Sequence, residues 1–117
     1  MSKWVDPLPV PPVAQKTFNP AYSSWADYYV IDMRASQHQF NAGLPGPATV
    51  WTYGQPGQSP VLLGPTIVAK TGRPVVVKYI NNLPTDPDAF PLKNAIDPTI
   101  AGAMVPTGAA IPHLHGG

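Results

Sequence analysis

The chain has 117 residues, a length that suits one domain with a modest core. Only 11% of the residues are charged, the net charge is +1, and the Lys and Arg residues form no cluster. This charge pattern argues against nucleic acid or an acidic membrane as the main partner. There is no cysteine, which excludes disulfides, thiolate catalysis and thiolate metal sites.

The first 21 residues predict an extended, proline-rich N-terminal arm, because proline excludes helix and interrupts strand pairing. We expect the arm to lie along the surface of a larger body, although a loose tail is the alternative. The apolar side chains that could anchor it are Trp4, Val10, Val13 and Phe18.

The body of the chain shows strand patterns and no helical periodicity. Residues 26–36, 48–53 and 75–80 predict strands, separated by clusters of glycine and proline. This pattern is typical of an all-β sandwich or barrel with Greek-key-like spacing.

Within the first strand, alternation predicts one apolar face and one solvated face. The apolar face comprises Tyr29, Ile31 and Met33, and the solvated face Asp32, Arg34 and Ser36. His38 follows, and we expect a solvated histidine at the end of the strand.

The final segment, Ile111–Gly117, contains two of the three histidines. On a β-strand, His113 and His115 would share one face, with Cα atoms roughly 6.6 Å apart, while Leu114 would point into apolar packing. Two such imidazoles can bind one metal ion or two neighbouring ions, because a metal–nitrogen bond is about 2.0 Å long. The spacing does not choose between these, and two ordinary surface histidines are a further alternative.

Four blocks of sequence, taken in order and spacing, resemble the first cupredoxin domain of multicopper oxidases. The blocks are Gly64-Pro65-Thr66-Ile67, Gly72 with Val75-Val76-Val77, Asn82-Leu83-Pro84, and His113-Leu114-His115-Gly116. The resemblance covers residues 26–117. The arm's opening, Trp4-Val5-Asp6-Pro7-Leu8-Pro9, and the long connection 85–112 are similar to the branch containing bacterial spore-coat laccase, phenoxazinone synthase and bilirubin oxidase.

The resemblance implies an all-β, Greek-key, cupredoxin-like sandwich or barrel that is incomplete in this chain. Residues 1–21 would be the arm, and residues 22–117 the N-terminal part of the first cupredoxin domain, with a long ordered loop at 85–112. Further strands would be expected beyond the His-X-His-Gly segment. The apparent lack of a secretory signal favours a cytoplasmic or spore-coat location over secretion.

For function, the resemblance implies a laccase-like oxidase that couples one-electron oxidation of a small aromatic substrate, such as a phenol, to reduction of dioxygen to water. His113 would bind the type 2 copper and His115 a type 3 copper of the trinuclear cluster. The other histidine motifs and the cysteine of the blue copper are missing from this sequence. The remainder of an oxidase polypeptide would have to supply them, so this chain is not expected to be active alone.

Two alternatives belong to other functional classes. A cupin-type enzyme with a single metal ion also uses His-X-His on a strand, but it needs a glutamate, and this sequence has none. The other alternative is a non-catalytic β-sandwich module, in which the histidines would bind no ligand. Metal analysis of the full-length protein would distinguish the three.

Overall fold

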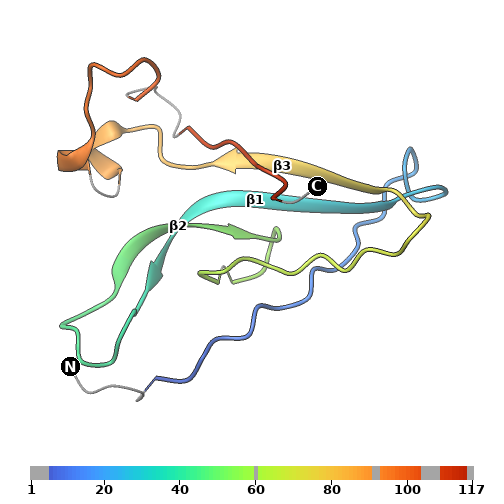
Figure 1. Cartoon of the computed structure of the whole chain (residues 1–117), viewed down its shortest axis with the longest axis horizontal. Coiled ribbons are helices and arrows are strands. Elements are labelled where there is room, and N and C mark those ends of the chain that lie inside the picture. The colour runs from blue at the N-terminus through green and yellow to red at the C-terminus, as the bar shows by residue number, and fades with distance from the viewer. Residues whose placement is uncertain (1–5, 60, 91–92, 104–108, 116–117) are drawn as a thin grey trace.

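The structure, a computed structural model, describes residues 6–59, 61–90, 93–103 and 109–115. These residues form one open three-stranded sheet, with strand order β2-β1-β3 (Figure 1). Its elements are β1 (Asp27–His38), β2 (Ala48–Gly54), β3 (Val75–Asn82) and the 3-10 helices η1 (Pro87–Ala89) and η2 (Lys93–Ala95). The prediction of an all-β, incomplete cupredoxin-like domain is confirmed.

Strand β1 is the centre of the sheet. Its residues 27–34 pair in parallel with β3, whereas its residues 32–38 pair in antiparallel fashion with β2. Strands β2 and β3 each pair with β1 along one edge, so within the described residues the other edge of each is an open edge of the sheet. The three predicted strands are present, and β1 and β3 each continue two residues beyond the predicted ends at 36 and 80.

The predicted apolar face of β1 is buried, but the prediction for its other face is wrong at Asp32. Tyr29, Ile31 and Met33 are buried as expected. Asp32 is buried too, because Arg34 covers it: Nη1 of Arg34 donates to Oδ2 of Asp32 at 3.0 Å. Arg34 is in turn fixed by carbonyl oxygens of the loop that follows β2, at Gln55 and Gln58. A charged pair and a loop therefore cover a face that alternation alone assigns to solvent.

The arm lies along the loop of residues 61–72, as the blue ribbon in Figure 1 shows. Val13 and Thr66 form a parallel bridge, in which the N–H of Ala14 donates to the carbonyl of Thr66 and the N–H of Thr66 donates to the carbonyl of Pro12. Farther on, the N–H of Thr17 donates to the carbonyl of Tyr28 in β1. Backbone hydrogen bonds thus hold the arm against the body.

The predicted apolar anchors of the arm are wrong wherever the structure describes them. Val10 and Phe18 are 87% and 82% exposed, and Val13 is more than half exposed. Trp4 lies outside the described residues. The side chain that the arm buries is the small Ala14. The boundary at residue 21 between arm and body stays a prediction.

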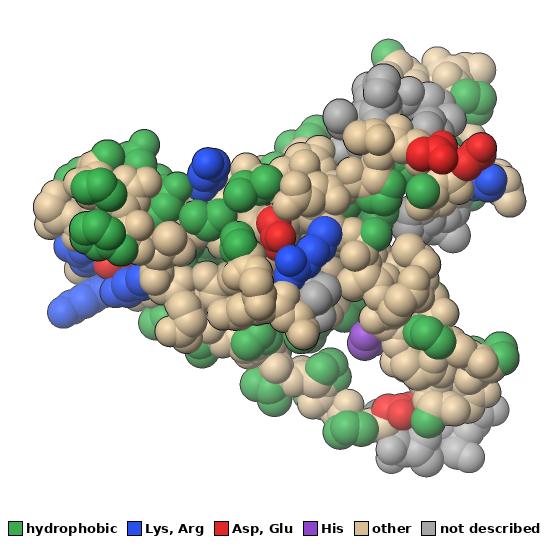
Figure 2. Space-filling model, turned by 180° about the vertical axis from the view of Figure 1, so that it is seen from behind, with side chains coloured by type: hydrophobic (Ala, Val, Ile, Leu, Met, Phe, Trp, Pro, Cys, Tyr) green, Lys and Arg blue, Asp and Glu red, His purple; other side chains and the backbone are tan. Residues whose placement is uncertain are grey.

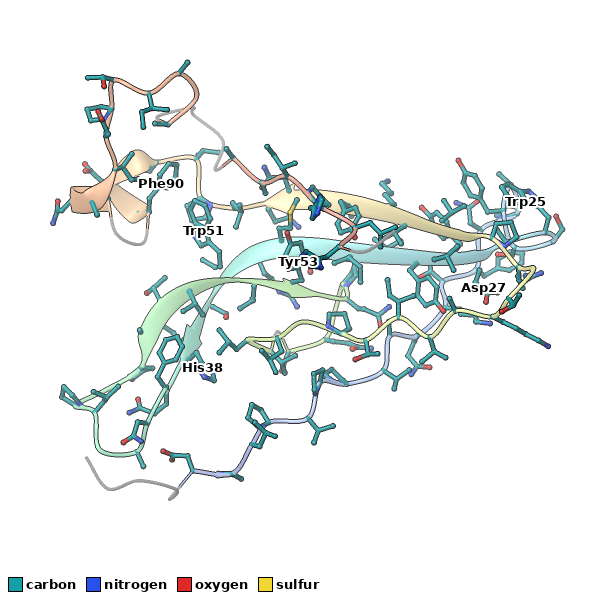
Figure 3. All side chains as sticks on the ribbon, in the orientation of Figure 1. Trp25, Asp27, His38, Trp51, Tyr53 and Phe90 are labelled. Atoms are coloured by element: carbon teal, nitrogen blue, oxygen red, sulfur yellow. The ribbon has the colours of Figure 1, made fainter. Side chains whose placement is uncertain are left out.

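The connection after β3 contains η1 and η2, which form a separate lobe beside the sheet (Figure 1). An aromatic contact joins this lobe to the sheet. Trp51 of β2 points towards Phe90, with ring centroids 5.2 Å apart in an edge-to-face arrangement (Figure 3). Phe90 is buried, so this contact fixes the start of the long loop on the sheet. Among the described residues, no helix has the length and apolar character needed to span a membrane.

Candidate functional site

His113 and His115 lie next to each other at the end of the described chain. Their ring centroids are 5.9 Å apart and the ring planes are inclined by 81°. Both side chains are exposed. The two imidazoles are therefore close enough to act on one ligand or on two adjacent ones.

The local backbone differs from the prediction. Residues 111–114 form no strand, and His115 is in a turn. Leu114, expected in apolar packing, is 80% exposed. A strand requires a pairing partner, and within the described part of the chain no strand pairs with this segment.

His113 lines a pocket of about 220 Å³ between the C-terminal segment and the sheet. Tyr53 of β2 and Tyr79 of β3 also line it, and their rings meet edge to face at a centroid distance of 6.3 Å. Figure 3 shows Tyr53 beneath the C-terminal segment. The two half-exposed tyrosines project from the strands on either side of β1. The pairing of β2 and β3 with β1 therefore brings both rings to the pocket that His113 lines.

One wall of this pocket depends on a close approach at Gly64, where φ is +67°. A Cβ at Gly64 would lie 3.2 Å from Cβ of Tyr53. The Gly64-Pro65-Thr66-Ile67 block is recognisable by resemblance, but its contact with Tyr53 was not predicted from the sequence. Neither tyrosine was predicted as part of a site, because phenol side chains on a strand look like ordinary sheet residues.

The two histidines suit copper as donors but do not complete a site. Neutral imidazole is a good ligand for copper, and exposed imidazoles are accessible to an ion. Within the described residues, no group of three or more His, Cys, Asp or Glu side chains could hold a metal ion. A copper ion at His113 or His115 would therefore need ligands from outside this part of the chain.

His38 lies at the end of a strand, as expected, but it is less solvated than expected. It ends β1, and its ring packs edge to face on Phe40 at a centroid distance of 4.8 Å. It is half-buried and lines a pocket of about 160 Å³ between the arm and the loop after β2 (Figure 3). His38 therefore belongs to the contact between arm and body and lines a different pocket from His113.

The strongest electrostatic cluster surrounds Asp27, at the start of β1. Nε of Arg73 donates to Oδ1 of Asp27 at 2.6 Å, and Nζ of Lys16 lies 2.8 Å from Oδ2. These bonds, chiefly the one from Arg73, lower the pKa of the Asp27 carboxyl below its usual value. Arg73 also donates to the carbonyl oxygens of Ser23 and Ala26. The cluster joins the arm to the turn before β3.

Comparison with known proteins finds laccases and multicopper oxidases. The chain is 35% identical over 118 residues to a laccase from Bacillus subtilis strain 168, and the match covers 100% of this chain and 21% of the laccase. It is 33% identical over 123 residues to a laccase from Haloferax volcanii, covering 99% of this chain and 20% of that protein. It is 39% identical over 89 residues to multicopper oxidase LPR1 homolog 5 from Oryza sativa subsp. japonica. That match covers 74% of this chain and 13% of the oxidase.

No protein-family model matches the chain. The chain spans about a fifth of the length of the laccases that it matches. Those matches extend over essentially the whole chain and agree with an incomplete, all-β sheet. The chain therefore belongs to the multicopper oxidase family, and it corresponds to a cupredoxin-like portion of its longer relatives.

Proposed function

We propose that the chain is the N-terminal segment of a laccase-like oxidase and supplies His113 and His115 to its oxygen-reducing copper cluster. The observation that carries the proposal is the pair of exposed imidazoles 5.9 Å apart, in a chain that matches laccases along its whole length. The parent oxidase would couple one-electron oxidation of a small aromatic substrate to the reduction of dioxygen to water.

Within this proposal, His113 is the ligand of the type 2 copper and His115 the ligand of a type 3 copper. When bound, the coppers would pass electrons from the oxidised substrate to dioxygen. This chain's own residues hold the ions and shape their surroundings.

The pocket beside His113 supports the same assignment. Apolar side chains and two tyrosine rings line it on one side of the exposed imidazole. A low-polarity wall beside a metal ligand limits solvent access and tunes the bound ion. We propose that Tyr53 and Tyr79 form that wall in the assembled oxidase.

The rest of the polypeptide must provide the remaining copper ligands and the blue copper, since this chain has three histidines and no cysteine. Within the family, we propose the branch of the spore-coat laccases. That proposal rests on the resemblance of residues 4–9 and 85–112, which lie partly outside the described residues.

Metal analysis and an absorption scan of the full-length protein test the proposal. We expect several coppers per polypeptide and the intense visible band of a blue copper site. A single bound iron or manganese would instead support the cupin-type alternative. A protein that binds no metal would support a non-catalytic β-sandwich module.

A further inference from the structure

A pocket of about 230 Å³ opens on the electrostatic cluster at the start of β1, and we call it the Asp27 pocket. Its lining includes Lys16, Phe18, Ser23, Asp27, Tyr28 and Arg73. Figure 2 shows basic side chains gathered beside hydrophobic ones at this end of the molecule, at the left of the view, and Figure 3 labels Asp27 there. The Asp27 pocket shares no lining residue with the pocket of His113.

The charges that line the Asp27 pocket do not balance. Asp27 is buried, and both of its carboxylate oxygens are already bound, Oδ1 by Nε of Arg73 and Oδ2 by Nζ of Lys16. Among the residues that line the pocket, these three are the charged ones. Two cations therefore share one anion, and the excess positive charge favours an anionic ligand.

Both cations also keep unused N–H donors. Arg73 uses Nε and Nη2 to bind Asp27 and the carbonyl oxygens of Ser23 and Ala26, whereas its Nη1 forms no hydrogen bond within the described residues. Nζ of Lys16 has three N–H donors, and Asp27 is its one salt-bridge partner in the described part of the chain. Because existing contacts already hold both side chains, a ligand would pay little of the entropy of ordering them. A carboxylate could accept hydrogen bonds from both cations.

Aromatic rings form another part of the wall. Phe18 lines the pocket but is 82% exposed, so most of its ring is free to contact a ligand. Tyr28 is buried, and its ring is stacked on that of Tyr22 at a centroid distance of 5.2 Å. An inorganic anion would leave the ring of Phe18 in water, whereas an aromatic anion would bury it.

We propose that the Asp27 pocket binds a small aromatic carboxylate, with its carboxylate on Arg73 and Lys16 and its ring against Phe18. The pocket is smaller than the roughly 300–1,000 Å³ of sites for drug-sized ligands, so it suits a molecule with a single ring. Binding at this site needs no copper and involves no reaction. The inference therefore goes beyond the proposed function and does not depend on the roles of His113 and His115.

Titration calorimetry of the full-length, copper-loaded protein with benzoate tests the inference. Benzoate has the carboxylate and the ring but no phenolic hydroxyl, so a laccase-like oxidase would not consume it during the measurement. We expect one benzoate per polypeptide. Phe18→Ala should weaken binding about fivefold through loss of an aromatic contact, and Lys16→Gln about fivefold through loss of a charge-assisted hydrogen bond. The copper content of each variant should equal that of the parent protein.

The chain offers a matched control for each variant. Leu8→Ala removes another highly exposed apolar side chain of the arm, 88% exposed against 82% for Phe18. Lys93→Gln removes a lysine that forms a salt bridge with Asp88 at 3.0 Å in the lobe after β3. Neither side chain lines the Asp27 pocket, so both controls should bind benzoate with the affinity of the parent protein.

The proposal would be overturned by an absence of saturable benzoate binding, or by equal affinity for phenol, which lacks the carboxylate. Unchanged benzoate affinity in Phe18→Ala, with inorganic phosphate competing equally well, would show a general anion site and reject the aromatic ligand. Unchanged affinity in Lys16→Gln would place the benzoate elsewhere, for example on a copper ion. Each of these results would leave the proposed function intact, because the metal analysis of the full-length protein tests that function separately.

Discussion

Gln55 binds the arm as a strand would, using its side-chain amide in place of a backbone. The N–H of Gln15 donates to Oε1 of Gln55 at 2.6 Å, and Nε2 of Gln55 donates to the carbonyl of Gln15 at 2.7 Å. The two residues are 40 positions apart in sequence, and Gln55 is buried. These two hydrogen bonds satisfy the backbone N–H and the backbone carbonyl of Gln15, where the arm passes the end of β2.

Gln55→Ala should therefore loosen the arm. Each lost hydrogen bond is worth about 1 kcal/mol and the backbone groups of Gln15 lose their partner, so we expect a cost of about 2 kcal/mol in the domain's free energy of unfolding. In the full-length protein this appears as a lower Tm and faster proteolysis of the arm. The matched control is Gln37→Ala, because Gln37 bonds Thr49 at 2.8 Å on an exposed part of the sheet. Equal losses of Tm and equal rates of arm proteolysis in the two variants would refute a special role for Gln55.

Asp27→Asn should lower the Tm above about pH 4 and matter less in more acidic solution. The pKa of Asp27 is lowered in the folded state by its hydrogen bonds to Arg73 and Lys16. A lowered pKa contributes stability that is complete above the ordinary aspartate pKa of about 3.9 and is lost as the pH falls through the folded-state value. The difference in Tm between the wild type and Asp27→Asn should therefore shrink below about pH 4.

Thermal unfolding at a series of pH values checks this prediction, with Asp97→Asn as the control. The pKa of Asp97 is also lowered, but by local hydrogen bonds from Thr99 within one exposed turn. We expect a smaller effect on Tm from Asp97→Asn, because Asp97 joins no distant segments. A pH-independent difference for Asp27→Asn would contradict the account of the cluster.

Gly64→Ala should be more damaging than Gly57→Ala. Both glycines have positive φ, +67° and +78°, so alanine at either position costs about 1 kcal/mol in backbone strain. At Gly57 a Cβ would meet nothing within 4 Å, whereas at Gly64 it would crowd Tyr53 at 3.2 Å. The extra loss of Tm in Gly64→Ala measures the close packing behind the pocket of His113. Equal losses in the two variants would show that the contact with Tyr53 is easily relieved.

The isolated 117-residue chain should not form a stable monomer. Within the part of the chain that the structure describes, both outer strands of the sheet leave an unpaired edge, and Tyr53 and Tyr79 are 39% and 43% exposed. We expect no cooperative thermal transition and poorly dispersed amide signals in the NMR spectrum of this segment alone. A sharp transition with dispersed signals would show that the three-stranded sheet is sufficient by itself.

The strands could be predicted because alternation and β-branched residues report directly on a half-buried sheet. The contacts of the arm could not be predicted, because they depend on the side-chain amide of Gln55 and on backbone groups. Neither leaves a hydrophobic pattern in the sequence. Asp32 was misassigned for a similar reason: its burial depends on Arg34 two residues away and on a loop after β2.

The histidine pair was found from sequence because two imidazoles one residue apart are a recognisable motif. The strand expected around it was wrong, since strand structure depends on a partner that the described residues do not provide. The tyrosine wall of the neighbouring pocket could not be predicted, because it requires knowing that β2 and β3 flank the same strand. The roles of His113 and His115 as copper ligands stay a prediction.

Copper content of histidine variants in the full-length protein tests the central claim most directly. His113→Ala and His115→Ala should each lower the number of coppers per polypeptide and abolish oxygen consumption, with His113→Ala chiefly depleting the type 2 electron-spin signal. His38→Ala is the matched control, because His38 contacts Phe40 and lines the arm pocket, and it should keep its full copper content. Full copper content and normal turnover in either His113→Ala or His115→Ala would contradict the assignment of these residues to the oxygen-reducing cluster.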